Sequence, residues 1–181
     1  MSIKSLIISV TRKLGWHPER CLTFASLIEG VIDQGSVHHH RLSKGLKHAS
    51  TFKSKLERIR RFFCKQVIDE AQLTHAWLMH IYGEIPKMDL MLDRTNWKFG
   101  KTDINYLVLA ARINKHIIFP IAWVLLPHQG NSDTKLRKEL LESFRKVFGF
   151  TCIRSFSADR EFIGKDWLDY LCEANIPFLS A

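Results

Sequence analysis

The spacing of apolar residues changes near residues 83–86. Across residues 17–63, apolar side chains recur every three or four positions, which is the spacing of one helix face. Examples are Leu22, Ala25, Ile28, Leu56, Ile59 and Phe63. After Pro86 the apolar residues form short runs rich in Ile, Leu and Val. The pattern predicts a helical region over residues 1–86 and a second region, residues 87–181, that is built around strands.

Three strand-like runs open the second region, at residues 88–92, 104–113 and 117–126. Asn114 and Lys115 lie between the last two runs and suit a two-residue hairpin turn, because Asn tolerates positive φ. The sequence therefore predicts a meander of three antiparallel strands.

Helices and strands alternate in the rest of the chain. Ser132 or Asp133 can cap a helix that ends at Gly149, with an apolar face formed by Leu136, Leu140, Leu141, Phe144, Val147 and Phe148. A strand at 153–158, a helix around Trp167 and a strand at 176–179 follow. Because strand–helix–strand crossovers leave the strands parallel, we expect an α/β fold with a mixed sheet flanked by helices. This is the order of the ribonuclease H-like fold.

The net charge of the chain indicates which classes of binding partner it favours. Lys and Arg number 27 against 18 Asp and Glu, for a formal net charge of +9, which favours a polyanion such as nucleic acid or an anionic membrane surface. The longest apolar stretch, residues 117–126, is too short to span a bilayer and contains Pro120. The N-terminus lacks the features of a signal peptide. We therefore expect a cytoplasmic protein that binds nucleic acid.

The segment 53–61 carries Arg58, Arg60 and Arg61 around an apolar stripe. A basic amphipathic helix that binds DNA is one interpretation, and a solvated face of a small helical bundle is the other. His38, His39 and His40 form a second polar cluster. Adjacent histidines cannot all face one metal ion, so we expect a polar turn there. The four scattered cysteines form no Cys-x-x-Cys pair and are expected to be buried thiols.

Two aspartates follow predicted strands: Asp93 at or just after the run 88–92, and Asp159 after the strand 153–158. If those strands are neighbours, the carboxylates meet at one edge of the sheet. Carboxylates are the ligands that Mg²⁺ prefers, and two metal ions held by such a cluster promote in-line phosphoryl transfer. Aspartate is also common where strands end, so spacing alone leaves a structural role open.

The residues around both aspartates resemble a known family. The segment LDRTNWKFGK at residues 92–101 resembles the first catalytic segment of DDE transposases of insertion-sequence family four. The segment ADREFIG at residues 158–164, followed by Trp167, is similar to the second. Between them, residues 126–127 and 130–132 match the loop before the first helix of that domain.

The resemblance implies a metal-dependent bacterial enzyme that cuts double-stranded DNA at terminal inverted repeats and joins the 3′ ends to target DNA. Asp93 and Asp159 would be the catalytic ligands of two Mg²⁺ or Mn²⁺ ions. Arg94, Lys98, Lys101 and Arg160 would contact DNA phosphates. A cytoplasmic, nucleoid-associated location follows, and a homodimer on DNA is one alternative for the oligomeric state.

The sequence also departs from the family. The third carboxylate is a Glu in a Tyr–Arg–Glu–Lys signature, and no such signature follows Asp159. Glu173 lacks this context and is expected to be a solvated helix residue, while Glu161 and Asp166 match no ligand position. These departures predict a C-terminally truncated copy with an incomplete ribonuclease H-like domain that does not transpose DNA alone. The rival hypothesis is a non-catalytic fragment that binds DNA or inhibits an intact transposase.

Trp97, Trp123 and Trp167 are the aromatic residues of this region that offer stacking surfaces for DNA bases. Each also falls within a predicted core element. We therefore expect all three to pack inside the protein.

Overall fold

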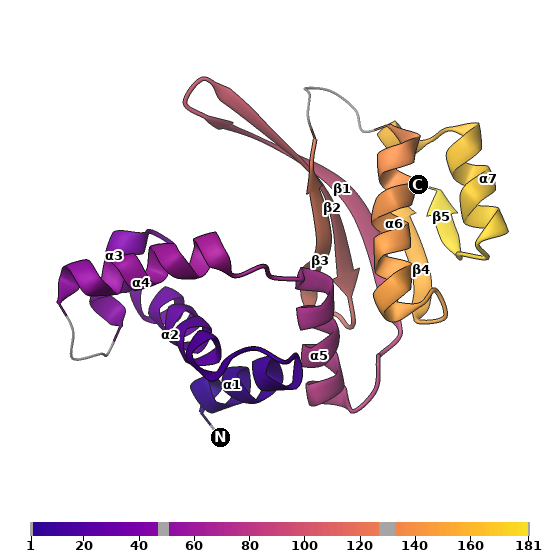
Figure 1. Ribbon diagram of the computed structural model, residues 1–181. Coiled ribbons are helices and arrows are strands. Elements are labelled where there is room, and N and C mark those ends of the chain that lie inside the picture. Colours follow the sequence, from indigo (N-terminus) through magenta and orange to yellow (C-terminus); the bar gives the residue numbers. More distant parts are fainter. Residues whose placement is uncertain (1, 47–50, 127–132, 181) are drawn as a thin grey trace. The chain divides into compact units, whose positions relative to one another are not determined.

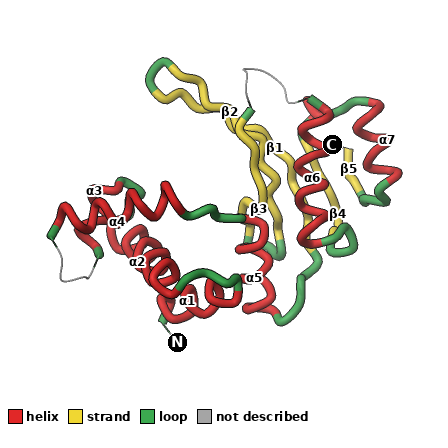
Figure 2. Tube along the Cα trace, viewed as in Figure 1, coloured by secondary structure: helices red, strands yellow, loops and turns green. Residues whose placement is uncertain are grey.

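The computed structural model describes residues 2–46, 51–126 and 133–180 of the 181-residue chain. The chain divides into two compact units, Met1–His80 and Ile81–Ala181. The first unit is helical and the second is built on a sheet (Figure 1 and Figure 2). The division falls within α5 (Glu70–Tyr82), a few residues before the boundary expected after residue 86. No helix among these residues is long and apolar enough to cross a membrane.

The first unit contains α1 (Ile3–Lys13), α2 (Pro18–Gln34), α3 (His39–Gly45), α4 (Phe52–Lys65) and most of α5. Hydroxyl oxygens of Ser2 and Thr51 cap α1 and α4 by accepting hydrogen bonds from backbone N–H groups three residues later. The core is formed by Leu27, Leu42, Leu46, Ile59 and Phe62. This apolar cluster joins α2, α3 and α4.

Two expectations for the helical unit are wrong in detail. Phe62, rather than Phe63, lies in the core, and Phe63 is half exposed and stacks on His39 at a centroid distance of 5.2 Å. The three histidines do not form a turn, because His38 precedes α3 and His39 and His40 form its first residues. Their rings contact Phe63 and Phe52, so aromatic packing favours the helix.

In the described part of the second unit, the sheet has five strands in the order β3-β2-β1-β4-β5. They are β1 (Met88–Phe99), β2 (Thr102–Arg112), β3 (Ile118–Leu125), β4 (Ile153–Ala158) and β5 (Phe178–Ser180). β1, β2 and β3 pair antiparallel, whereas β4 and β5 are parallel to β1. The expected mixed α/β sheet with flanking helices is confirmed.

Two helices pack on this sheet: α6 (Thr134–Phe148) and α7 (Lys165–Glu173), the latter preceded by the short 3-10 helix η1 (Arg160–Phe162). The Asp133 carboxylate caps α6 by accepting from the Leu136 N–H, while Ser132, the alternative cap, lies outside the described residues. Figure 1 shows α6 lying along the sheet. The Trp167 ring of α7 contacts Phe156 of β4 at 5.9 Å, which places α7 on the same apolar layer.

The β-hairpins differ from the sequence expectation. β1 extends to Phe99 instead of ending near Leu92, because its outer half pairs with β2 alone. The turn between β2 and β3 is longer than two residues, since β2 ends at Arg112 and β3 begins at Ile118. Asn114 stabilises this turn with its side-chain oxygen, which accepts hydrogen bonds from the backbone N–H groups of His116 and Ile117.

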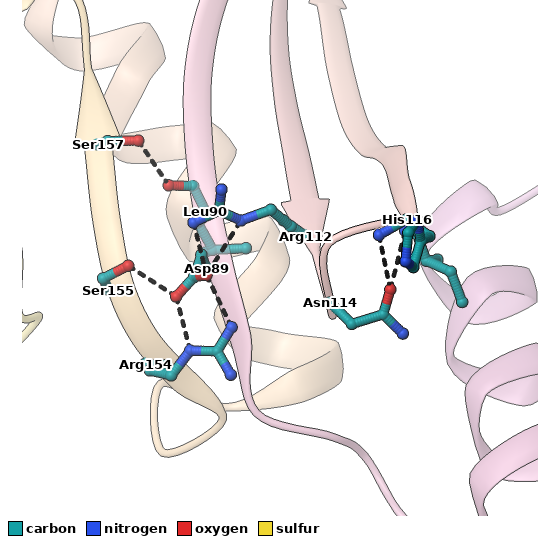
Figure 3. Close-up of polar contacts among 9 residues, drawn as sticks. Asp89, Leu90, Arg112, Asn114, His116, Arg154, Ser155 and Ser157 are labelled. Atoms are coloured by element: carbon teal, nitrogen blue, oxygen red, sulfur yellow. Dashed lines mark hydrogen bonds and ion pairs between the residues drawn. The ribbon is translucent and has the colours of Figure 1, made fainter.

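A buried carboxylate joins the three central strands near the beginning of β1 (Figure 3). Asp89 is only 7% exposed. Arg154 of β4 donates two hydrogen bonds to it, at 2.8 and 2.7 Å, and Arg112 of β2 donates two more, at 3.2 and 3.0 Å. The Ser155 hydroxyl donates a fifth, at 2.8 Å. Because both guanidinium groups bind one carboxylate, this contact ties β1 to both neighbours.

The same contact sits at an irregularity in strand pairing. Met88 lies opposite Ile153, but Asp89 lies opposite Ser155, so Arg154 is an extra residue in β4. A shift of one residue would turn each side chain of the strand to the other face of the sheet. Asp89 and Arg154 therefore stabilise the register in which Leu92 lies opposite Ala158.

Asp89→Asn should destabilise the chain by about 2–3 kcal/mol at pH 7, because the substitution leaves two guanidinium groups without their anion. The Arg154 hydrogen bonds hold the pKa of Asp89 well below its ordinary value of 3.8. The stabilisation is therefore present above about pH 4 and lost progressively as the pH falls below it. Urea denaturation at pH 7 and pH 3 should show the difference between wild type and variant shrinking on acidification.

The matched control is Asp169→Asn, which removes an exposed carboxylate on α7 and should change stability by no more than about 0.5 kcal/mol. An Asp89→Asn effect as small as the control's, or one independent of pH, would contradict the role of Asp89.

Candidate functional site

Asp93 and Asp159 each follow the last paired residue of the parallel β1–β4 ladder, which ends at Leu92 opposite Ala158. Side chains alternate between faces along a strand, so Asp93 shares a face with Asp89, and Asp159 shares it with Ser155. The register therefore brings the two predicted carboxylates to neighbouring positions on one face of the sheet. Both residues are exposed to solvent.

Each carboxylate is oriented by its own backbone. Asp93 Oδ1 accepts a hydrogen bond from the Arg94 N–H at 2.7 Å, and Asp159 Oδ1 accepts one from the Arg160 N–H at 2.6 Å. The second bond also caps η1, which turns the chain away from the sheet directly after β4. Each of the two carboxylates thus accepts a hydrogen bond from the next residue's N–H, at the point where β1 and β4 stop pairing with each other.

Another carboxylate, Glu161 of η1, is held by an arginine. Arg94 donates from Nε and Nη2 to the two oxygens of Glu161, at 3.0 and 2.9 Å. The side chains are 17% and 25% exposed, so this bidentate ion pair is partly shielded from water. Glu161 therefore pairs with Arg94 in this structure, and this pair joins β1 to η1, while the contact of Arg94 with DNA phosphate stays a prediction.

A buried cation lies near Glu161. Arg137 of α6 is 6% exposed and its guanidinium stacks on the Phe162 ring at 4.9 Å. Burial lowers the pKa of Arg137, while the nearby charge of Glu161 opposes that shift. The sequence interpretation missed Arg137, although it lies three, four and seven residues before the buried Leu140, Leu141 and Phe144 and so falls on the inner helix face.

Lys98 and Lys101 lie away from the carboxylates, on an extension of the β1–β2 hairpin. β4 pairs with β1 only over Met88–Leu92, and β3 pairs with β2 only from Tyr106 onward. Arg94 is held by Glu161 and the Asn105 carbonyl accepts from the Leu126 N–H, so residues 95–104 form the two-stranded arm that projects beyond the other strands in Figure 1. Both lysines are exposed on this arm. A two-stranded ribbon of this kind has the dimensions to enter a DNA groove.

The tryptophans divide between packing and exposure. Trp167 is 2% exposed, as expected for a core residue, whereas Trp97 on the arm is 58% exposed and Trp123 on β3 is 43% exposed. The expectation of packing is thus wrong for two of the three. Trp97 contacts Tyr106 edge to face at 5.9 Å and leaves much of its ring in solvent.

The other predicted DNA contacts lie in two places. Arg160 is exposed and directly follows Asp159. Arg58, Arg60 and Arg61 belong to α4 in the helical unit. There Arg58 pairs with Glu19 at 2.9 Å, and Arg60 pairs with Glu57 at 3.1 Å.

The carboxylate pair fits a metal ion only in part. Oxygen ligands suit Mg²⁺, which keeps several waters in proteins and needs few carboxylates. However, the described residues hold no group of three or more His, Cys, Asp or Glu side chains placed around one metal position. Asp93 and Asp159 thus offer two ligands of the three that the family resemblance implies.

The four cysteines were expected to be buried thiols. This is wrong for two of them, since Cys64 and Cys172 are exposed.

Comparisons of the chain with protein-family models, with curated proteins and with solved structures found no match. Transposase membership therefore stays a prediction from the two sequence motifs.

The Arg94–Glu161 pair can be tested with a double-mutant cycle of Arg94→Gln and Glu161→Gln. Because the contact is bidentate and largely shielded, we expect a coupling free energy of about 1–2 kcal/mol. Urea denaturation of the wild type, both single variants and the double variant gives this quantity. A coupling near zero would show that the two side chains stabilise the fold independently of each other.

Proposed function

We propose that this chain carries two of the three carboxylates of a DDE-type DNA transposase site and binds double-stranded DNA. The observation that supports this most directly is the neighbouring placement of Asp93 and Asp159 after the last pair of the β1–β4 ladder. The motifs around them supply the family, and the net charge of +9 favours a nucleic-acid partner.

The sheet supports the same proposal. Three antiparallel strands followed by two strands parallel to β1, in the order β3-β2-β1-β4-β5, is the arrangement expected of a ribonuclease H-like domain. That fold hosts different reactions, so the order alone does not assign one. The two carboxylates that follow β1–β4 pairing, together with the motifs around them, favour metal-dependent phosphoryl transfer as the reaction we propose.

The proposed roles of the residues follow from their positions. Asp93 and Asp159 hold the metal ions through carboxylate oxygens, and the backbone N–H groups of Arg94 and Arg160 orient these carboxylates. Metal ions held there would supply the activation of the attacking oxygen and the stabilisation of the leaving oxygen that an in-line displacement needs. Arg160, Lys98 and Lys101 contact the DNA backbone.

The arrangement around Glu161 favours the second candidate, a DNA-binding chain without catalysis. Its carboxylate, the acidic group of η1, is paired with Arg94 and so does not complete the site. Among the residues that the structure describes, no third carboxylate joins Asp93 and Asp159 around one metal position. Without a third ligand the chain would bind DNA, or pair with an intact transposase, and leave the DNA uncut.

Metal binding tests the carboxylate pair directly. Titration of the full chain with Mn²⁺, followed by electron paramagnetic resonance of the free ion, should show a site that Asp93→Asn and Asp159→Asn each weaken by at least about tenfold, because each removes a ligand. Asp169→Asn removes the same charge from exposed α7 and should leave binding unchanged. Equal Mn²⁺ binding by all four proteins would refute the proposed site.

Cleavage separates the two candidates. We expect the full chain with Mg²⁺ or Mn²⁺ to leave supercoiled plasmid DNA intact, because two carboxylates position the metal ions incompletely. Agarose gels would detect nicking. Nicking that Asp93→Asn abolishes would show that the chain is itself a nuclease, whereas DNA binding without nicking supports the non-catalytic candidate.

A further inference from the structure

A pocket of about 250 Å³ opens between α2 and α4 of the helical unit. Its lining residues are Glu19, Arg20, Thr23, Arg58, Arg61, Phe62, Lys65 and Gln66. The charged members comprise four cations and one carboxylate. The pocket therefore concentrates positive charge within a concave surface.

Both α2 and α4 contribute cationic side chains to the pocket. Arg58, Arg61 and Lys65 are spaced by three and four residues and so lie on one face of α4. Arg20 faces them from the first turns of α2. Glu19 lies beside Arg58, with the two charged groups 2.9 Å apart, which offsets one positive charge and orients that guanidinium. The remaining cations give the pocket an excess of positive charge.

We propose that this pocket binds a phosphate group. Guanidinium groups match phosphate oxygens with paired hydrogen bonds, and a lysine ammonium adds a point charge. The source is either the backbone of a nucleic acid or a free phosphate ion, because both present the same oxygens. The assignment rests on the α2–α4 pocket and is independent of Asp93, Asp159 and the proposed catalytic function.

The size of the pocket agrees with this ligand. Pockets that enclose whole small-molecule ligands typically measure roughly 300–1,000 Å³, so a volume of about 250 Å³ suits a single compact group. Gln66 adds a further feature, since its Oε1 is buried and has no hydrogen-bond partner in the described chain.

The same helix provides matched controls. Lys53 and Arg60 lie on α4 and are exposed, and neither lines the pocket. Arg60 pairs instead with Glu57. The double variants Arg61→Gln/Lys65→Gln and Lys53→Gln/Arg60→Gln therefore remove equal charge from one helix, inside and outside the pocket respectively.

The first arm of the test measures binding of the full chain to a 20-base-pair duplex by fluorescence anisotropy over a range of salt concentrations. If the pocket takes a backbone phosphate, the Arg61→Gln/Lys65→Gln variant should bind about tenfold more weakly. Its salt slope should fall in magnitude by about one, as expected for one lost phosphate contact. The Lys53→Gln/Arg60→Gln variant should change much less if the pocket, rather than the whole predicted basic stretch that includes Arg60, contacts the phosphate. Circular dichroism checks that both variants keep their helices.

The second arm titrates the full chain with inorganic phosphate at constant ionic strength and follows the arginine Nε–Hε signals by NMR. A saturable shift of Arg61, without a shift of Arg60, supports the pocket. If this shift occurs while both variants bind duplex DNA equally, the source is free phosphate. If the two double variants weaken DNA binding equally and phosphate shifts neither arginine, the proposal is overturned. Asp169→Asn, which removes an exposed carboxylate of α7, should give the wild-type result in both arms.

Discussion

The sheet depends on one buried carboxylate. Asp89 accepts hydrogen bonds from Arg112 and Arg154 on the strands to either side, and taking that charge out of water is tolerable only because both guanidinium groups meet it there. Arg154 reaches Asp89 as the extra residue of β4, so the ion pair and the strand register form together. Four residues along β1 the same register brings Asp93 beside Asp159. A structural carboxylate thus determines where the candidate functional carboxylates meet.

The sequence predicts the mixed sheet well because alternating apolar runs and capped amphipathic helices are local signals. Asp133 and Gly149 mark the two ends of α6, as the cap residues indicate. The sequence pattern indicates less about which strands pair with each other. The extra residue at Arg154 and the continuation of β1 to Phe99 depend on which strands become neighbours, and no periodicity within one segment reports that. The prediction of a turn at the three histidines failed for the same reason. Their helix, α3, is stabilised by contacts with aromatic rings of α4, which are distant in sequence.

The candidate site was predictable as a pair of aspartates but not as an electrostatic environment. Sequence motifs pointed to Asp93 and Asp159, and strand order brings them together. The sequence motifs did not indicate that Arg94 would pair with Glu161, because this residue lies 67 positions away along the chain. Likewise Arg58 and Arg61 were predicted as a linear basic stretch, but their distinctive feature is a pocket that also needs Arg20 from α2. The partners of a charged side chain depend on which residues the fold brings next to it, and the order of residues along the chain does not give these neighbours.

The arm formed by residues 95–104 has a thermodynamic consequence of its own. Arg94 and Asn105 anchor the base of the arm to Glu161 and Leu126, and beyond them the two strands pair only with each other, an arrangement that is marginal in water. Opening the arm therefore requires far less free energy than unfolding the sheet below it, and its amides belong to the least protected part of the second unit. A partner that binds Lys98 or Trp97 must supply part of the free energy that orders the arm, so affinity and local folding are coupled there.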